Sequence, residues 1–317
     1  MKPPFSLFLL LLSLPLHPGE ILHDIKGYEA VSFCCTNRDG DERAIVRKFF
    51  LDDRSMTLSV DTQTLETSIV PIPSPDCIER DCRKDSLYQS LLHISSSPPY
   101  PLQNDGIVSG NSGIFITTDL CPSSKTGFER RLYRKVAKLF TNPVPITVFV
   151  TKRWIEKHRE SFEELIDMRD RGELSIVWGN HTADHIYHRG MDLRHNFILS
   201  DEERLTKDIL DLEIELLSRG EKPSIFFRAP GLVSDRKSID TVRALGLITI
   251  GADTWIAKGE KIHEGSIILV HGNLNEKRGV DMFLKLIGKK NFHFRPLSLS
   301  QIGGAHTLSV PMGRNAK

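Results

Sequence analysis

The sequence has no surplus of either charge, since 42 Lys and Arg face 41 Asp and Glu among its 317 residues. Nucleic-acid-binding proteins usually carry a basic surplus, so this balance argues against a nucleic-acid partner. Cysteine is scarce as well, and five residues are too few for a disulfide-rich scaffold. Hydrophobic residues make up 39% of the chain and are mixed with charged ones, which excludes a disordered or fibrous protein. At about 150 residues per domain, the length predicts roughly two domains.

Long apolar runs are missing too, except at the N-terminus. Lys2 is followed by the almost wholly apolar stretch Phe5–Leu14, which Pro15 ends. About ten residues are too few for a helix that crosses roughly 30 Å of hydrocarbon. A basic start, a short apolar run and a helix breaker predict that residues 1–19 are a secretory signal peptide. The protein is then periplasmic or secreted, with no integral membrane span after cleavage. A buried N-terminal strand or an uncleaved anchor is the alternative.

Export would permit disulfide bonds. Cys77 and Cys82 enclose a short polar loop, and we expect them to pair. Cys34 and Cys35 are adjacent, and adjacent cysteines seldom bond to each other. These two are expected to be buried as apolar side chains, or one of them to reach Cys121. With five cysteines, at least one has no partner within the chain.

The chain changes character near residue 105. Before it, short runs rich in Val, Ile, Phe and Thr predict an antiparallel meander, with strands at 28–36, 43–51, 56–61 and 64–70. Ser, Pro and Gly then gather in residues 95–113, which is the composition of a linker or of an extended strap. We therefore expect a β-rich N-terminal domain and linker over 20–105, a larger domain over 106–305 and a C-terminal tail over 306–317.

The larger domain alternates apolar runs with helical patterns. The runs predict strands at 114–118, 145–150, 174–178, 224–228, 246–250, 266–271 and 292–296. Helical spacing of apolar residues occurs at 128–140, 152–171 and 201–219. Such alternation predicts a parallel sheet, closed or open, whose chemistry lies at the C-terminal ends of the strands.

Histidine, in contrast to cysteine, is plentiful, with 12 residues, and several of them follow predicted strands. Five strand ends carry ionisable or aromatic residues: Asp119, His181 with His185, Arg228, Asp253 with Trp255, and His271. On a helical turn, His181 and His185 would share one face and could bind one metal ion. Ordinary surface histidines are the alternative, and the regular placement at strand ends favours the metal.

The other strand-end residues suggest acid–base chemistry. His271, at the rim of a buried strand, could donate a proton, or it could be a core histidine bonded to the backbone. Asp119 could be a base, a metal ligand or a helix N-cap. The planar fork of Arg228 could hold a carboxylate or form a structural ion pair, and an Arg228 that holds Asp119 would do both.

The order of these residues resembles that of the polysaccharide deacetylase family, carbohydrate esterase family four, with its NodB homology domain. The resemblance covers residues 113–300. The family's five motifs correspond here to Thr117-Thr118-Asp119-Leu120-Cys121, Asn180-His181-Thr182-Ala183-Asp184-His185, Arg228-Ala229-Pro230-Gly231, the pair Asp253 and Trp255, and Ile267-Ile268-Leu269-Val270-His271. The first motif is closest to a subgroup with a TFDxCP form and a later Gly-Phe-Asp/Glu, here Gly127-Phe128-Glu129.

The resemblance implies a deformed (β/α) barrel of about seven parallel strands and a divalent metal, usually Zn²⁺. It implies hydrolysis of N-acetyl groups on an amino-sugar polymer such as peptidoglycan or a chitin-like glycan. His181 and His185 would bind the metal, Asp119 would be the base oriented by Arg228, and His271 would protonate the leaving amine. The backbone N–H of Gly231 would stabilise the oxyanion, and Trp255 would line the acetyl pocket or pack in the core.

One departure concerns the metal. The family's third ligand is a second Asp, and Leu120 stands at that position. Waters could complete a site of two histidines, Asp119 could turn onto the metal, or a carboxylate such as Glu129 or Asp184 could serve. We favour two histidines with Asp119 nearby. The third motif also lacks an aromatic residue, so Gly231 is expected to leave room for a reshaped groove.

Two other functions compete with deacetylation. A degenerate homologue could bind glycan without turnover, which Leu120 favours and the retained acid–base residues oppose. An O-acetyl esterase could use the same fold. Residues 20–105 could bind substrate, cover the opening of the barrel or recruit a partner.

Overall fold

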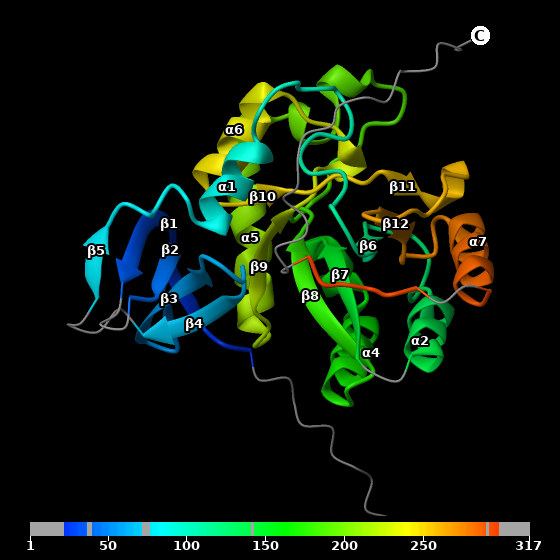
Figure 1. Ribbon diagram of the computed structural model, residues 1–317, viewed down its shortest axis with the longest axis horizontal. Coiled ribbons are helices and arrows are strands. Elements are labelled where there is room, and N and C mark those ends of the chain that lie inside the picture. The colour runs from blue at the N-terminus through cyan, green and yellow to red at the C-terminus, as the bar shows by residue number, and fades with distance from the viewer. Residues whose placement is uncertain (1–21, 37–39, 72–76, 141–142, 290–291, 298–317) are drawn as a thin grey trace, which may run out of the picture.

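The protein contains two β-sheets joined side by side (Figure 1). The computed structural model describes residues 22–36, 40–71, 77–140, 143–289 and 292–297. The predicted signal peptide and C-terminal tail lie outside these residues. Among the helices that are described, none is long and apolar enough to cross a membrane.

The first sheet is the predicted antiparallel meander. Its strands are β1 (Ile25–Thr36), β2 (Glu42–Leu51), β3 (Arg54–Asp61), β4 (Thr67–Pro71) and β5 (Ile78–Arg80). They lie in the order β4-β3-β2-β1-β5, so β5 returns to pair with the free edge of β1. Helix α1 (Leu87–Ile94) follows, and the Ser86 side chain caps it by accepting a hydrogen bond from the Gln89 backbone N–H.

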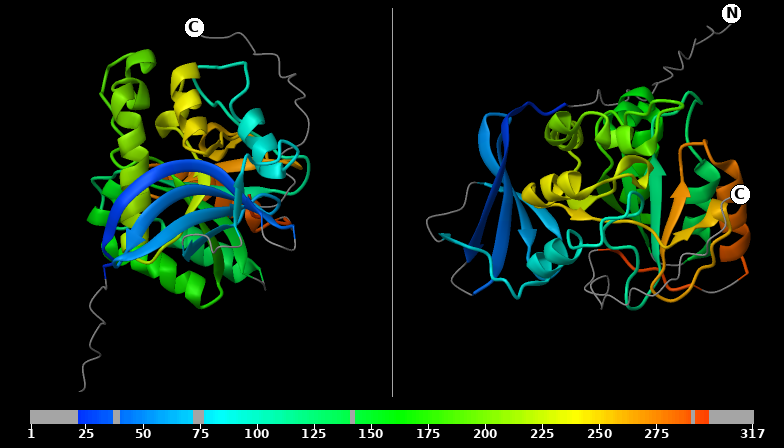
Figure 2. Two further views of the ribbon diagram at one scale, coloured as in Figure 1. Left: turned by 90° about the vertical axis from the view of Figure 1, so that its left-hand side faces the viewer. Right: turned by 90° about the horizontal axis from the view of Figure 1, so that it is seen from above.

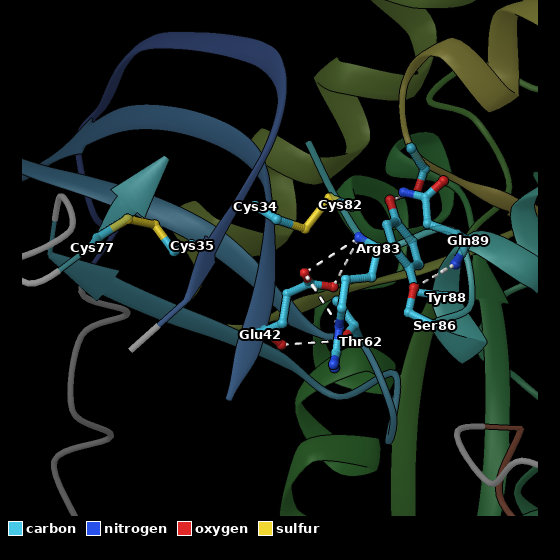
Figure 3. Close-up of a disulfide and its surroundings, with 11 residues drawn as sticks. Cys34, Cys35, Glu42, Thr62, Cys77, Cys82, Arg83, Ser86, Tyr88 and Gln89 are labelled. Carbon is cyan, nitrogen blue, oxygen red and sulfur yellow. Dashed lines mark hydrogen bonds and ion pairs between the residues drawn. A yellow bond between two sulfur atoms is a disulfide. The ribbon is translucent and has the colours of Figure 1, made fainter. Parts of the chain in front are cut away.

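The predicted Cys77–Cys82 disulfide is wrong, as is the predicted reach of Cys34 or Cys35 to Cys121. Cys34 is bonded to Cys82 and Cys35 to Cys77 (Figure 3). The loop between Cys77 and Cys82 forms strand β5, and an extended chain of that length holds its ends too far apart for a disulfide. Neighbours in β1 point to opposite faces, so the two adjacent cysteines reach different partners.

The second sheet is the barrel, and it confirms the fold that the resemblance implies. Its strands are β6 (Phe115–Leu120), β7 (Val144–Val150), β8 (Leu174–Asn180), β9 (Pro223–Phe227), β10 (Ile248–Thr249), β11 (Thr254–Trp255) and β12 (Ile267–His271). All pairs are parallel, in the order β10-β9-β8-β7-β6-β12-β11. The predicted strand at 292–296 is wrong, because Phe294 makes only an isolated bridge with Ile114. The short β11 is the seventh strand instead.

Helices connect the strands. They are α2 (Arg130–Leu139), α3 (Lys152–Lys157), α4 (Arg159–Asp170), α5 (Leu205–Ser218), α6 (Arg236–Ala244) and α7 (Lys277–Ile287). Short 3₁₀ turns occur at Leu193–His195, Phe197–Leu199, Glu202–Arg204, Pro230–Leu232 and Ile256–Lys258. The predicted single helix at 152–171 is two helices that meet at His158.

Strand alternation divides the apolar side chains into two layers. One set packs between the sheet and its outer helices, and on β6 it includes Ile116 and Leu120. The other set includes Phe115, Phe149 and Leu269 and continues into the first sheet. Successive residues of β6 therefore face different surroundings, and this alternation decides which of its residues can reach the site.

Part of the segment 104–113 forms a strap that lies beside the edge strand β10. The Ile107 N–H donates to Thr249 O, 2.9 Å away, and the Gly110 N–H donates to Gly265 O just before β12, 2.7 Å away. Gly106 has φ +86°, and a Cβ there would lie 2.3 Å from Thr249 O, so only glycine allows this approach. The predicted linker thus links the two sides of the open barrel.

The first sheet packs on the barrel beside α5 rather than over the strand ends (Figure 2). The contact contains a buried ion pair, in which Arg47 Nε lies 2.7 Å from Glu213 Oε2 and Arg47 Nη2 lies 2.9 Å from Glu213 Oε1. Arg47 also donates to Leu245 O, and Tyr28 donates to Glu213. Both charged side chains are essentially inaccessible to water, so each depends on the other for its solvation.

We predict that Arg47→Ala lowers the free energy of unfolding by about 3–5 kcal/mol, because Glu213 would stay buried without its partner. Urea denaturation measures this. The double variant Arg47→Met/Glu213→Leu should recover at least half of the loss. Arg236→Ala removes an exposed ion pair with Asp240 and should cost less than about 1 kcal/mol. An equally small effect of Arg47→Ala would contradict the structural role of the pair.

Candidate active site

A cavity of about 540 Å³ opens where the C-terminal ends of the barrel strands meet. Six of the eight predicted site residues line it: Asp119, His181, His185, Gly231, Trp255 and His271. Arg228 lies directly behind Asp119. Asp253 is not among the lining residues, and its carboxylate instead accepts from the Ile267 N–H at 3.0 Å and pairs with His263. The structure therefore brings seven of the eight together.

Asp119 is held by a fully buried arginine. Arg228 Nη1 donates to Asp119 Oδ1 at 2.8 Å, and Asp119 Oδ2 lies 3.7 Å from His181 Nε2. Burial alone would raise the pKa of Asp119, but Arg228, His181 and His271 outweigh it, and the pKa lies below its ordinary value. Asp119 lies within β6 and so is not a helix N-cap. Its ionised carboxylate faces the cavity.

His181 and His185 come together, but not on the predicted helical turn. Residues 181–190 form a loop in which Thr182 and His185 have positive φ angles. The two imidazole rings lie 4.9 Å apart between centroids. His181 Nδ1 lies 2.8 Å from Arg228 O and donates its proton to that carbonyl, so Nε2 is the nitrogen that faces Cys121 Sγ, 3.5 Å away, and Asp119.

Cys121 completes a cluster of three ligating side chains, which the sequence analysis did not anticipate. Ligand atoms of Cys121, His181 and His185 all lie within 4.8 Å of one another. Burial raises the pKa of the Cys121 thiol, but His185 and His181 outweigh it and hold the pKa well below its usual value. A thiolate is the form of cysteine that binds metals.

The departure at Leu120 is explained by strand alternation. Leu120 is fully buried in the outer apolar layer, whereas Asp119 and Cys121 on either side of it line the cavity. The predicted carboxylate substitutes lie elsewhere: Glu129 pairs with Arg131, and Asp184 pairs with Arg204. The ligand that Leu120 cannot supply is thus available one residue later.

His271 is positioned by Glu276. His271 Nδ1 lies 2.9 Å from Glu276 Oε2, and Trp255 Nε1 donates to the same carboxylate. Burial lowers the pKa of His271, but the neighbouring Cys121 sulfur and the Glu276 carboxylate outweigh it and raise the pKa well above its usual value. The imidazolium is therefore available as an acid. Register pairs His271 with Asp119 across β12 and β6, which places both at one level of the barrel.

The space beside Gly231 is filled rather than open. Gly231 has φ +64°, and a Cβ there would lie 2.6 Å from the Phe197 ring. Phe197 packs against Tyr187, with ring centroids 5.2 Å apart. The expected extra room at the third motif is therefore wrong, because an aromatic residue from another loop occupies it.

The sequence did not reveal several residues of the site, among them Cys121, Arg153, Tyr187, Phe197 and Glu276. Cys121 could have been found, since residues two apart on a strand share a face. Arg153 comes shortly after the predicted strand at 145–150, so its place at a strand end could also have been predicted. Phe197 and Glu276 come from loops, whose course no periodicity predicts.

Comparison with known proteins identifies the domain. Residues 109–250 match the family model for polysaccharide deacetylase. This match identifies residues 109–250 as a polysaccharide deacetylase domain and covers less than half of the chain. Among solved structures, a family 4 carbohydrate esterase from Bacillus anthracis is 20% identical, with 67% of this chain and 89% of that chain covered and a TM-score of 0.45.

Two further structures give similar values. PdaA of Bacillus subtilis, a family 4 carbohydrate esterase, is 16% identical over 69% of this chain and 89% of its own, with a TM-score of 0.45. A family 4 pseudoenzyme from Bacillus anthracis is 11% identical over 62% of this chain and 68% of its own, with a TM-score of 0.44. The family model, rather than these likenesses, identifies the deacetylase domain.

Restoring the family's second Asp should harm this protein. We predict that Leu120→Asp lowers the free energy of unfolding by about 3–5 kcal/mol, because it buries a carboxylate in the apolar layer. Zinc affinity, measured by competitive titration on the folded fraction, should not rise. Leu120→Met is the control and should cost less than about 1.5 kcal/mol. A stable Leu120→Asp protein that binds zinc more tightly would show that residue 120 faces the cavity.

Proposed function

We propose that the deacetylase domain is a metal-dependent hydrolase that removes N-acetyl groups from an amino-sugar polymer, such as peptidoglycan or a chitin-like glycan. One observation carries the proposal: a single cavity contains a base, an acid and three ligating side chains. Asp119 is the base and His271 the acid. Metal-assisted hydrolysis of an amide uses all three functions at one place.

The metal would be held by Cys121, His181 and His185. Two imidazoles and a thiolate form a donor set that suits Zn²⁺, with a fourth position left for substrate or water. The Arg228 carbonyl fixes the orientation of His181 for this purpose. In such a site a divalent metal polarises a carbonyl and acidifies water.

Asp119 accepts the proton of the attacking water. Its ionised state at neutral pH follows from its neighbours, above all Arg228, which also prevents the carboxylate from turning away. The second oxygen of Asp119 points toward His181, so the base lies next to the proposed metal position. Proximity of this kind removes the entropic cost of bringing a base to the water.

His271 donates a proton to the leaving amine. Glu276 orients the ring and holds its charge, and Trp255 in turn orients Glu276. Trp255 also lines the cavity, where it would contact the acetyl group. Gly231 lines the cavity, and its backbone N–H is proposed to stabilise the oxyanion.

We also propose that the protein is exported to the periplasm or secreted. Four of its five cysteines form disulfides, and disulfides persist in oxidising compartments. The division into a domain at 20–105 and another at 106–305 stays a prediction. All residues that line the cavity lie between Asp119 and Glu276, so the first sheet is proposed to support the barrel rather than to cover its opening.

A second candidate function is favoured by one observation, that Cys121, His271 and Glu276 line the same cavity. With Glu276 behind His271, these residues form a nucleophile, a base and an orienting group. In that case Cys121 Sγ would attack the acetyl carbonyl, the C–N bond would break as His271 protonates the amine, and water would hydrolyse the acetyl thioester to acetate. This route needs no metal, so a chelator separates it from the first.

The metal assignment predicts a spectroscopic signature. Cobalt-loaded protein should show a near-ultraviolet charge-transfer band from a thiolate ligand, and Cys121→Ser should abolish it and weaken metal binding roughly tenfold or more. His181→Ala and His185→Ala should lower metal content. Glu129→Gln is the control and should change neither. A cobalt spectrum that is the same with and without the Cys121 sulfur would exclude Cys121 as a ligand.

Acetate release tests the reaction. Zinc-loaded protein should release acetate from N-acetylated glycans, and His271→Ala should reduce kcat by about 10²–10⁴-fold. His263→Ala, an exposed histidine away from the cavity, should keep full activity.

Four other results would each change the assignment. Activity that survives a chelator but not Cys121→Ser would favour the thioester route. Release from O-acetyl groups alone would make the protein an esterase. Glycan binding without any release would make it a non-catalytic homologue, and no binding and no release would reject all of these functions.

A further inference from the structure

Arg153 is the charged residue at the end of the strand between the two halves of the site. Strand β7 lies between β6, which carries Asp119 and Cys121, and β8, which leads to the histidines. Arg153 follows the end of β7, and its backbone N–H donates to Ala183 O, 3.1 Å away, in the histidine loop. The side chain lines the cavity. Its guanidinium therefore faces the place where the substrate must lie.

The charge of Arg153 has no carboxylate partner among the described residues, whereas the other charges of the cavity are matched. Asp119 is paired with Arg228, and Glu276 with His271. No hydrogen bond or ion pair joins the Arg153 side chain to any residue in the part of the chain that the structure describes, and the side chain is exposed. Lys152, its neighbour on the same helix, pairs with Glu156 instead. The cavity thus offers one uncompensated cation.

An aromatic surface lies on the same cavity wall. Tyr187 is 59% exposed, and its ring packs against the Phe197 ring. A half-exposed aromatic ring that is fixed in place suits the apolar face of a sugar, and its hydroxyl remains available to polar groups. Tyr187, Arg153 and His185 line the same cavity, so a sugar on the ring would place its substituents in the cavity that Arg153 also lines.

We propose that Arg153 binds a carboxylate of the substrate, so that the natural substrates are acidic N-acetylated glycans rather than neutral ones. The inference rests on the proposed deacetylase function and adds the substrate class to it. A guanidinium binds a carboxylate through two parallel hydrogen bonds, which neutral sugars cannot supply. The carboxylate could belong to the sugar itself or to a peptide attached to it, and the chemistry that Arg153 recognises is the same.

The test compares three N-acetylated glycans of equal length. The first carries carboxylates on its sugars, the second is the same glycan after chemical reduction of those carboxylates to alcohols, and the third carries carboxylates only on attached peptides. Binding is measured by calorimetry and acetate release by kcat/KM, with the full zinc-loaded protein. The variants are Arg153→Gln and Arg153→Lys, with Lys152→Gln as the matched control from the same helical turn.

We expect the unsubstituted protein to prefer at least one acidic glycan over the reduced glycan by roughly 10- to 100-fold, the range for one charge-assisted contact. Arg153→Gln should remove the preference, because the acidic glycan then falls to the level of the reduced one. Arg153→Lys should restore part of it, and Lys152→Gln should change nothing. The acidic glycan that shows the preference identifies the source of the carboxylate.

Two kinds of failure are distinguishable. A binding preference that depends on Arg153, without acetate release from any glycan, would reject the deacetylase function and keep the acidic subsite. Equal treatment of all three glycans, or a uniform loss in Arg153→Gln, would overturn the inference and leave the deacetylase function intact. Absence of binding to every glycan would overturn both.

Discussion

The buried guanidinium of Arg228 is the interaction on which the centre of the barrel depends. It donates to Asp119 and Thr117 on β6 and to two backbone carbonyls, Ile250 O and Gly251 O, after β10. Its face lies on the Phe149 ring, 4.2 Å from the centroid. An arginine without access to water must have its donors satisfied, so the ends of three strands are tied to one plane. The guanidinium also keeps Asp119 ionised, and the backbone carbonyl of Arg228 orients His181. Arg228 is therefore required both for the packing of the strand ends and for the geometry of the candidate site.

The order of strands and the polar residues at their ends could be predicted from the sequence, because both follow from local patterns. Apolar runs bounded by turn residues mark strands, and an ionisable residue after such a run must lie at the rim. What could not be predicted depends on contacts between distant segments. The observed disulfides, Cys34–Cys82 and Cys35–Cys77, follow from the pairing of β5 with β1. Phe197 contacts Gly231 from a segment without periodicity. The role of Cys121 is an intermediate case, since alternation along β6 implies it, but the motif comparison directed attention to Leu120.

The first sheet influences the site without touching the cavity. Helix α5 bears Glu213 on the side of that sheet, and its backbone also accepts hydrogen bonds from the end of β8 and from the loop that follows. Asn180 Nδ2 donates to Ile209 O at 3.0 Å, and the Ala183 N–H donates to Asp208 O at 2.9 Å. One helix therefore holds the N-terminal sheet on one face and the loop of the two histidines on another. The first sheet is therefore connected through α5 to the loop that carries His181 and His185. The buried Arg47–Glu213 ion pair is part of this connection.

The unequal fate of the five cysteines sets a condition on how the chain can mature. Four sulfurs must lose their hydrogens and join, while the fifth must stay reduced only a short way along the chain from them. An oxidant does not distinguish among them in the unfolded chain. Only the folded barrel, which buries Cys121 close to His181 and His185, protects it from the wrong partner. Oxidation before the barrel has folded would allow Cys121 to form a disulfide with one of the other four cysteines, and its sulfur would then be lost from the cavity. The order of barrel folding and disulfide formation therefore matters for this protein.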